Sequence, residues 1–219
     1  MSFSVRGILA PAAAGVILAA SLAMPGARAQ TPSIYGVELV KNGGAEADVG
    51  APSNSQIVKP TGWTTTGEFT AVQYGASGGF PDATSPGPAE RGKNLFEGGN
   101  VAKSTGTQSI SLAAAASDIA AGTVKYSFSA WLGGYSNQTD NATASLSFRD
   151  AAGRTVGSVV LGPVTPVERK DVTGLLQRSH SGVVPKAAAT AVVTIVFTRY
   201  EGTYNDGSAD NVSLKLTKT

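Results

Sequence analysis

The sequence predicts an all-β protein in which two antiparallel sheets pack as a sandwich, with one short helix at most. Helical periodicity is almost absent, because its one candidate segment, 113–121, is short and ends at Gly122. Elsewhere, short runs rich in Thr, Ser and Val alternate apolar and polar residues between turn signals. An antiparallel sandwich of this kind places its first and last strands near each other, which would bring the two ends of the domain together.

The expected strands follow one another along the chain. The clearest is 124–132, in which every second residue is apolar, and 191–197 is apolar on both faces, as in a central strand. A tight turn at 150–153 joins two further strands. We expect about nine or ten strands, at 37–40, 69–74, 94–96, 107–112, 124–132, 143–149, 155–161, 167–176, 191–197 and in the run 205–216. The Gly- and Pro-rich stretches 47–62 and 75–92 are predicted as long loops.

The first 29 residues are predicted to be a secretory signal peptide. Arg6 precedes an apolar run at 8–24, and Ala27-Arg28-Ala29 forms a cleavage site. An uncleaved anchor is the alternative, but the run of 17 residues is at the short limit for a spanning helix and contains Pro11. We therefore expect a secreted bacterial protein, extracellular or periplasmic, with no membrane span after cleavage.

Charge and cysteine content exclude several classes. The chain has 17 basic and 15 acidic residues, and two of the basic ones, Arg6 and Arg28, leave with the signal, so the mature chain is neutral. It has no basic cluster to bind nucleic acid. Without cysteine, it has no disulfide framework and no thiolate metal site. Residues 30–219 are enough for a single domain with a sizeable core, which we place at about 37–216.

The order of the motifs carries a family resemblance. The front motif is N-G-x-x-E at 42–46, and the back motif is D-N-V-S-L at 210–214. Between them lie G-T-V-K-Y-S-F-S-A-W-L-G-G-Y at 122–135, A-x-L-x-F-x-D-A-x-G at 144–153 and L-G-P-V at 161–164. This succession resembles galactose-binding-like jelly-roll domains, similar to carbohydrate-binding modules and F-box-associated-type sugar-binding domains. The resemblance implies the jelly-roll fold more strongly than any ligand.

A structural calcium ion is expected where the two end motifs meet. Asp210 has the parity of the apolar residues of the last strand, so alternation points it toward the core, where an unpaired carboxylate needs a cation or hydrogen bonds. The resemblance implies that Glu46 and Asp210 hold Ca²⁺ together with the Gly44 carbonyl, and less directly Asn42 or Asp206. Hydrogen bonds to backbone amides, without a metal, are the alternative.

Trp131 is the first candidate for ligand binding. It lies on the polar face of the strand 124–132, where it either stacks on a sugar ring or is covered as part of the core. Aromatic residues on or beside loops could also line a cleft, with three polar neighbours. The further binding candidates are Trp63, Tyr74, Tyr135, Gln138, Asp140 and Arg149; Tyr200 and Tyr204 are loop aromatics of the same kind.

The predicted function is therefore non-catalytic binding of a carbohydrate or cell-surface polymer by a monomer. No catalytic residue is assigned: His180 is the only histidine, and no nucleophile elbow precedes a helix. A structural or adhesive exoprotein is the first alternative, and a polysaccharide hydrolase or lyase is the second.

Overall fold

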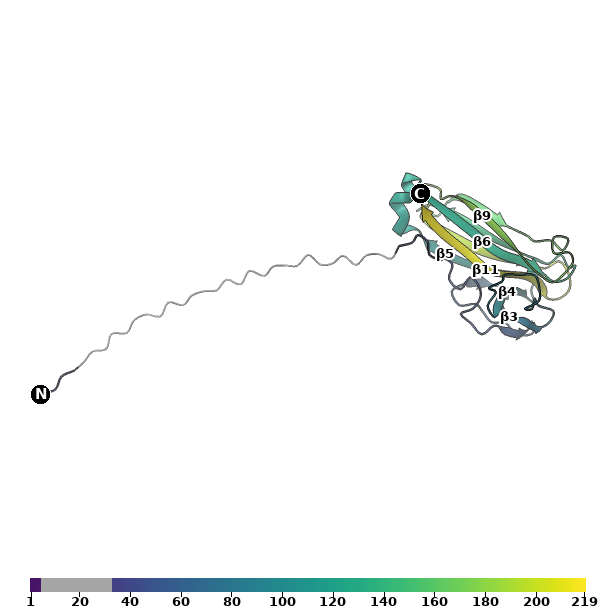
Figure 1. Cartoon of the computed structure of the whole chain (residues 1–219), viewed down its shortest axis with the longest axis horizontal. Helices are drawn as coiled ribbons and strands as arrows, with labels where there is room; N and C mark the ends of the chain where they lie inside the picture. The colour runs from purple at the N-terminus through teal and green to yellow at the C-terminus, as the bar shows by residue number, and fades with distance from the viewer. Residues whose placement is uncertain (5–32) are drawn as a thin grey trace. The chain divides into compact units, whose positions relative to one another are not determined.

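Two β-sheets pack face to face in this computed structural model, which describes residues 1–4 and 33–219 (Figure 1). The six-stranded sheet has the order β1-β3-β4-β11-β6-β9, and the five-stranded sheet has the order β2-β5-β10-β7-β8. The strands of the first are β1 (Ala51–Ser53), β3 (Thr70–Ser77), β4 (Asn94–Gly99), β6 (Val124–Gly134), β9 (Gly174–Val183) and β11 (Asn205–Lys218). Those of the second are β2 (Thr64–Thr66), β5 (Lys103–Ser111), β7 (Asn141–Arg149), β8 (Thr155–Leu161) and β10 (Thr190–Thr198).

The architecture confirms the predicted jelly-roll sandwich. The named strands pair antiparallel, with the single exception of β1 and β3. The apolar run at 191–197 forms β10, which is central in its sheet, as its two apolar faces predict. The helical segment also lies where it is expected, as η1 (Ala113–Ala115) and α1 (Ala116–Ala121). It ends at Gly122, whose φ of +80° is accessible to glycine at little cost.

Aromatic rings join the two sheets in the core. Phe69 packs against Phe96 of the six-stranded sheet, with ring centroids 5.2 Å apart, and against Phe197 of the five-stranded sheet at 5.3 Å. Trp63 covers the same cluster and is 5.5 Å from Phe96. The alternating residues of β6, β7 and β10 complete this core from both sides. Large rings of this kind supply much of the burial that holds a sandwich without disulfides.

The segment before β1 closes the edge of the sandwich against the last strand. Tyr35 forms a parallel bridge with Leu216, and the amide of Leu39 donates to the Leu214 carbonyl at 3.0 Å. The predicted strand 37–40 is therefore an extended segment along β11 and not a strand of its own. At the same end, the Tyr35 hydroxyl donates to Asp118, which also pairs with Lys218, so the start, the helix and the C-terminus are tied together (Figure 1).

The structure differs from the expected strands at three further places. The run 167–176 was expected to be a strand, but turns occupy 166–171, and β9 begins only at Gly174. Lys170 and Asp171 both have positive φ, which lies outside the extended conformation of a regular strand. β9 then continues to Val183 as a polar edge strand without the alternation that marks a half-buried strand. The short strands β1 and β2, three residues each, were missed because three residues show no periodicity.

A bulge in β11 reverses the predicted direction of Asp210. Ala209 faces the core, so Asp210 points to the outer face of the six-stranded sheet, which is the face turned away from the five-stranded sheet. Asn211 then adopts a φ of +46°, the register shifts, and Val212 faces the core again. The parity argument was wrong because an extra residue restarts the alternation.

The predicted signal peptide has its apolar run and cleavage site outside the described residues. In the part of the chain that is described, no helix is long and apolar enough to cross a membrane. Residues 33–219 belong to one compact unit.

Candidate functional site

The front and back motifs meet, as the sequence predicts. The Val212 amide donates to the Gly43 carbonyl at 2.9 Å. A Cβ on Gly44 would stand 3.5 Å from Asp210 Oδ1 and 3.9 Å from Glu46 Cγ, so both carboxylic side chains lie against this glycine. The turn thus brings two acidic residues that are far apart in sequence to one place, which we call the seam.

Asp210 is the buried member of the seam. Its Oδ2 accepts a hydrogen bond of 2.7 Å from the Tyr74 hydroxyl, and its Oδ1 accepts one of 2.7 Å from the Asn211 amide. Burial raises the pKa of Asp210 to about 8, and the charge of Glu46 makes a smaller contribution in the same direction. The two hydrogen bonds lower the pKa but do not offset the effect of burial. The guanidinium of Arg91 lies 5.2 Å from the centre of the Tyr74 ring and opposes the shift. A cation at the seam would relieve the same unfavourable burial.

Glu46 is the exposed member of the seam. Its Oε1 accepts hydrogen bonds from the amides of Lys93 at 2.9 Å and Asn94 at 2.8 Å. These bonds fix the carboxylate against the start of β4. Oxygen ligands of this kind, one from each motif, suit Ca²⁺.

The other predicted calcium ligands lie elsewhere, apart from Gly44. The Asn42 side chain accepts from the Ala47 amide and donates to the Thr61 carbonyl, so it holds its own loop. Asp206 lies beside Asp140, which accepts its amide at 3.1 Å. Within residues 33–219, no three His, Asp or Glu side chains form a metal-binding group. A calcium ion at the seam would therefore need backbone carbonyls and water besides the two carboxylates.

Trp131 lies on the outer face of the six-stranded sheet, in register with Asp210 on one side and Gln177 on the other. It is partly exposed and does not belong to the core between the sheets. This position confirms the parity that sets it apart from Phe128 and Leu132 of its own strand. On the same face, the next two rows carry the polar residues Ser129, Ser213, Ser179, Ser127, Lys215 and Ser181.

The loop between β3 and β4, 78–93, covers one end of this face. Its Pro86 carbonyl accepts the Leu175 amide at 2.8 Å, and its Glu90 carbonyl accepts the Asn211 side chain at 3.0 Å. Ser208 and Leu175 flank Gly133, two residues after Trp131, and are buried although they point to the outer face. In the other direction Ser127 and Lys215 are exposed. Trp131 therefore stands where the covered half of the outer face ends and the open, polar half begins.

The covered half contains a buried glutamate that sequence reasoning missed. Glu97 on β4 is 1% exposed; its Oε1 accepts the Ser208 hydroxyl at 2.5 Å, and its Oε2 is buried with no hydrogen-bond partner in the described structure. Burial raises the pKa of Glu97 well above its usual value, and the nearby Asp206 adds to the shift. Burial and Asp140 likewise raise the pKa of Asp206 to about 6. No sequence signal marks Glu97, because its burial depends on segments that are distant in the sequence, including the one that carries Tyr204.

The remaining binding candidates lie at several different places. Trp63 is 8% exposed and belongs to the core, and its indole N–H donates to the Asn42 carbonyl at 3.1 Å, so its ring offers little surface to a ligand. Arg149 is exposed at the far end of β7. Tyr74 is engaged with Asp210 beneath the loop, as described above.

Tyr135, Gln138 and Asp140 lie together in the loop after β6. Asp140 is 1% exposed, and its carboxylate accepts the amides of Tyr200 at 2.6 Å and Glu201 at 2.9 Å, so it holds two loops together and has no free face for a ligand. Tyr135 is half-exposed and packs against Gly79 of the covering loop. The side-chain oxygen of Gln138 is buried and has no hydrogen-bond partner among residues 33–219.

The solved structures with a similar architecture are distant in sequence. No family model matches the chain, and no curated protein matches it. A cyclase from Fischerella sp. TAU, solved with 4-(1H-indol-3-yl)butan-2-one, has a TM-score of 0.54 at 14% identity over 84% of this chain and 98% of its own. This likeness establishes a shared fold and carries nothing about the reaction.

Two further structures resemble the chain at lower TM-scores. A family 16 carbohydrate-binding module gives 0.49 at 17% identity over 80% of this chain and 98% of its own. The enzymatically active domain of tailspike protein 4 from bacteriophage CBA120 gives 0.48 at 17% identity over 82% of this chain. The chain spans only 21% of that tailspike structure.

Proposed function

We propose that this chain is a secreted, non-catalytic module that binds a carbohydrate or related cell-surface polymer on the outer face of the six-stranded sheet. The observation that carries the proposal is the partly exposed indole of Trp131 at the end of an open polar surface. Sugar rings present an apolar C–H face that packs on an aromatic ring, while neighbouring polar groups bind the hydroxyls. Gln177, Ser129 and Ser179 supply such groups beside Trp131.

The rigidity of the platform supports binding. β6 pairs along its length with β11 and β9, so the backbone of Trp131 is fixed on both sides. A surface that is already ordered loses little conformational entropy when a ligand binds. The covering loop, held at Pro86 and Glu90, closes one end of the surface before any ligand arrives.

The acidic residues near cavities support a binding role over a hydrolytic one. A cavity of about 780 Å³ lies beside the seam and is lined by Glu46 and Asp48. Both carboxylates are already used: Asp48 accepts the Thr61 amide and hydroxyl at 2.7 Å, and Glu46 accepts two amides. Glycoside hydrolysis needs one carboxylic acid that can give its proton to the substrate. Glu97, whose pKa is raised by burial, does not line this cavity.

A glycan-array screen of residues 30–219 tests the proposed function. We expect binding to at least one polysaccharide, retained on the isolated polymer in affinity gel electrophoresis, with no release of reducing ends over time. Absence of binding to every glycan and every cell-wall preparation would contradict the proposal. Release of sugar ends would instead identify a hydrolase or lyase.

We further propose that the seam binds a structural Ca²⁺ through Glu46 and Asp210. A ligand that binds only the native state stabilises it by RT ln(1 + [L]/Kd), ~2.7 kcal/mol at a hundredfold excess over Kd. For a domain of this size, the melting temperature should rise by roughly 5–10 °C when calcium is added to demetallated protein. Asp210→Ala should abolish the rise, as followed by differential scanning calorimetry.

Asp206→Asn is the matched control for this experiment, because it removes a carboxylate from the same strand but away from the seam. It should keep the calcium response. An unchanged melting curve of the demetallated wild type on adding calcium would show that hydrogen bonds alone close the seam.

A further inference from the structure

Two lysines stand without acidic partners on the open half of the outer face. Lys125 on β6 and Lys215 on β11 are both exposed. Lys215 pairs with Ser127 and Thr217 pairs with Lys125, so the two lysines are diagonal neighbours on one face. Diagonal residues of an antiparallel pair are ~7–8 Å apart. Neither side chain forms an ion pair or hydrogen bond within residues 33–219.

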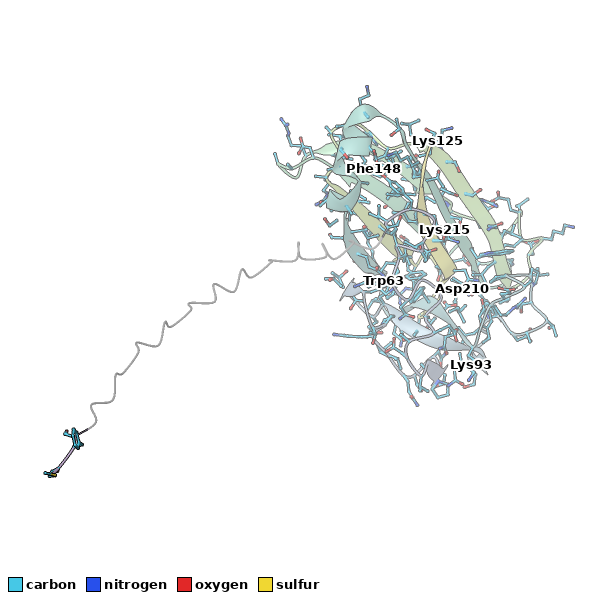
Figure 2. All side chains as sticks on the ribbon, turned by 60° about the vertical axis from the view of Figure 1, so that its left-hand side comes forward. Trp63, Lys93, Lys125, Phe148, Asp210 and Lys215 are labelled. Atoms are coloured by element: carbon cyan, nitrogen blue, oxygen red, sulfur yellow. The ribbon has the colours of Figure 1, made fainter. Side chains whose placement is uncertain are left out.

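The lysines and Trp131 lie along one straight track. On β6, Trp131 lies six positions after Lys125, which corresponds to ~20 Å at the rise of a strand. Between them the face carries Ser127 and Ser129, with serines of β9 and β11 in the same rows. Figure 2 shows Asp210, Lys215 and Lys125 in succession along this sheet. The track thus has an aromatic ring at one end, hydroxyl groups in the middle and two positive charges at the other end.

The acidic groups near this track are already engaged. Asp210 is buried and bonded to Tyr74. Glu38, at the edge of the face, accepts the Ser213 hydroxyl at 2.5 Å and the Leu214 amide at 2.9 Å. Two like charges held side by side repel each other, and an anion placed between them removes that repulsion.

We propose that the polymer bound on this face is acidic, with carboxylate or sulfate groups on sugar rings several residues from the ring that stacks on Trp131. The inference rests on the proposed function, because it names the chemical class of ligand for the same face. The ammonium groups of Lys125 and Lys215 act as point charges that bind and attract the polymer's anions. The uncharged serines between them suit the intervening hydroxyl groups.

The test compares polygalacturonate and alginate with two neutral polymers, galactan and amylose, in affinity gel electrophoresis and calorimetry at low and high salt. We expect residues 30–219 to bind an acidic polymer, with affinity that falls as salt rises. The double variant Lys125→Gln with Lys215→Gln should bind it roughly 3- to 30-fold more weakly. The double variant Lys59→Gln with Lys103→Gln, at exposed lysines off this track, should bind as the wild type does.

The outcomes separate this inference from the proposed function. Binding of a neutral polymer that depends on Trp131, without binding of any acidic polymer, would overturn the inference and leave the function standing. An acidic polymer that binds equally to both lysine double variants would also overturn it, because the contact would then be nonspecific. If none of the four polymers binds and the glycan array is also negative, the proposed function fails and the inference fails with it.

Discussion

Replacing Trp131 by alanine is expected to weaken binding of the polymer by at least about tenfold, or ~1.4 kcal/mol, while the protein stays folded. The indole is partly exposed on the outer face, so its removal takes the stacking surface from the ligand and leaves no cavity between the sheets. The free energy of unfolding should fall by no more than about 1 kcal/mol. Trp131→Phe, which keeps an aromatic face, should recover part of the affinity.

Trp63 is the natural control for this experiment, because it is the only other tryptophan of the chain and lies in the core. Trp63→Ala removes a ring that packs on Phe69 and Phe96, and it should lower the free energy of unfolding by ~3–5 kcal/mol. Urea unfolding of both variants measures how much stability each substitution removes. If Trp131→Ala loses as much stability as Trp63→Ala, the indole of Trp131 supports the covering loop and the proposed site is wrong.

Stability is expected to fall as the pH rises above the acidic range, and Glu97 is one of the groups responsible. Its folded pKa is raised well above the usual value by burial, so the unfolded chain loses the proton first. The stabilising contribution is complete below the unfolded pKa of ~4.3 and is lost as the pH rises through the folded pKa. Asp206, with a pKa of about 6, and Asp210, at about 8, change stability in the same direction. Each group adds a slope of ~1.4 kcal/mol per pH unit within its own window.

The Glu97→Gln variant isolates the contribution of Glu97. The amide fills the same space and cannot ionise, so above the unfolded pKa of ~4.3 the free energy of unfolding should decline less steeply with pH, by about the slope of one group. Urea unfolding at a series of pH values measures the difference. Glu90→Gln, at an exposed glutamate of the covering loop, should keep the wild-type slope. Equal slopes for Glu97→Gln and wild type would mean that Glu97 is ionised in the folded protein.

Local sequence was sufficient for most of the fold. Half-buried strands such as β6 and β7 alternate apolar and polar residues because one face meets the core, and this period is written in the sequence itself. The end of the helix was also predictable, because Gly122 readily takes the left-handed conformation that stops it. The meeting of the end motifs followed from the order of motifs shared with jelly-roll domains, and the bond between Gly43 and Val212 confirms it.

Only the tertiary structure decided what the outer face exposes. The bulge at Asn211 turns Asp210 away from the core, and one residue of extra backbone leaves no periodic signal. The sequence did not predict strand β9, because an edge strand exposed to solvent on both faces need not alternate apolar and polar residues. Glu97 and Trp131 both point to the outer face of the six-stranded sheet, but Glu97 is buried there, whereas Trp131 lies at the border of open solvent. Burial on that face depends on which distant segment folds over it, and alternation along a single strand cannot report that contact.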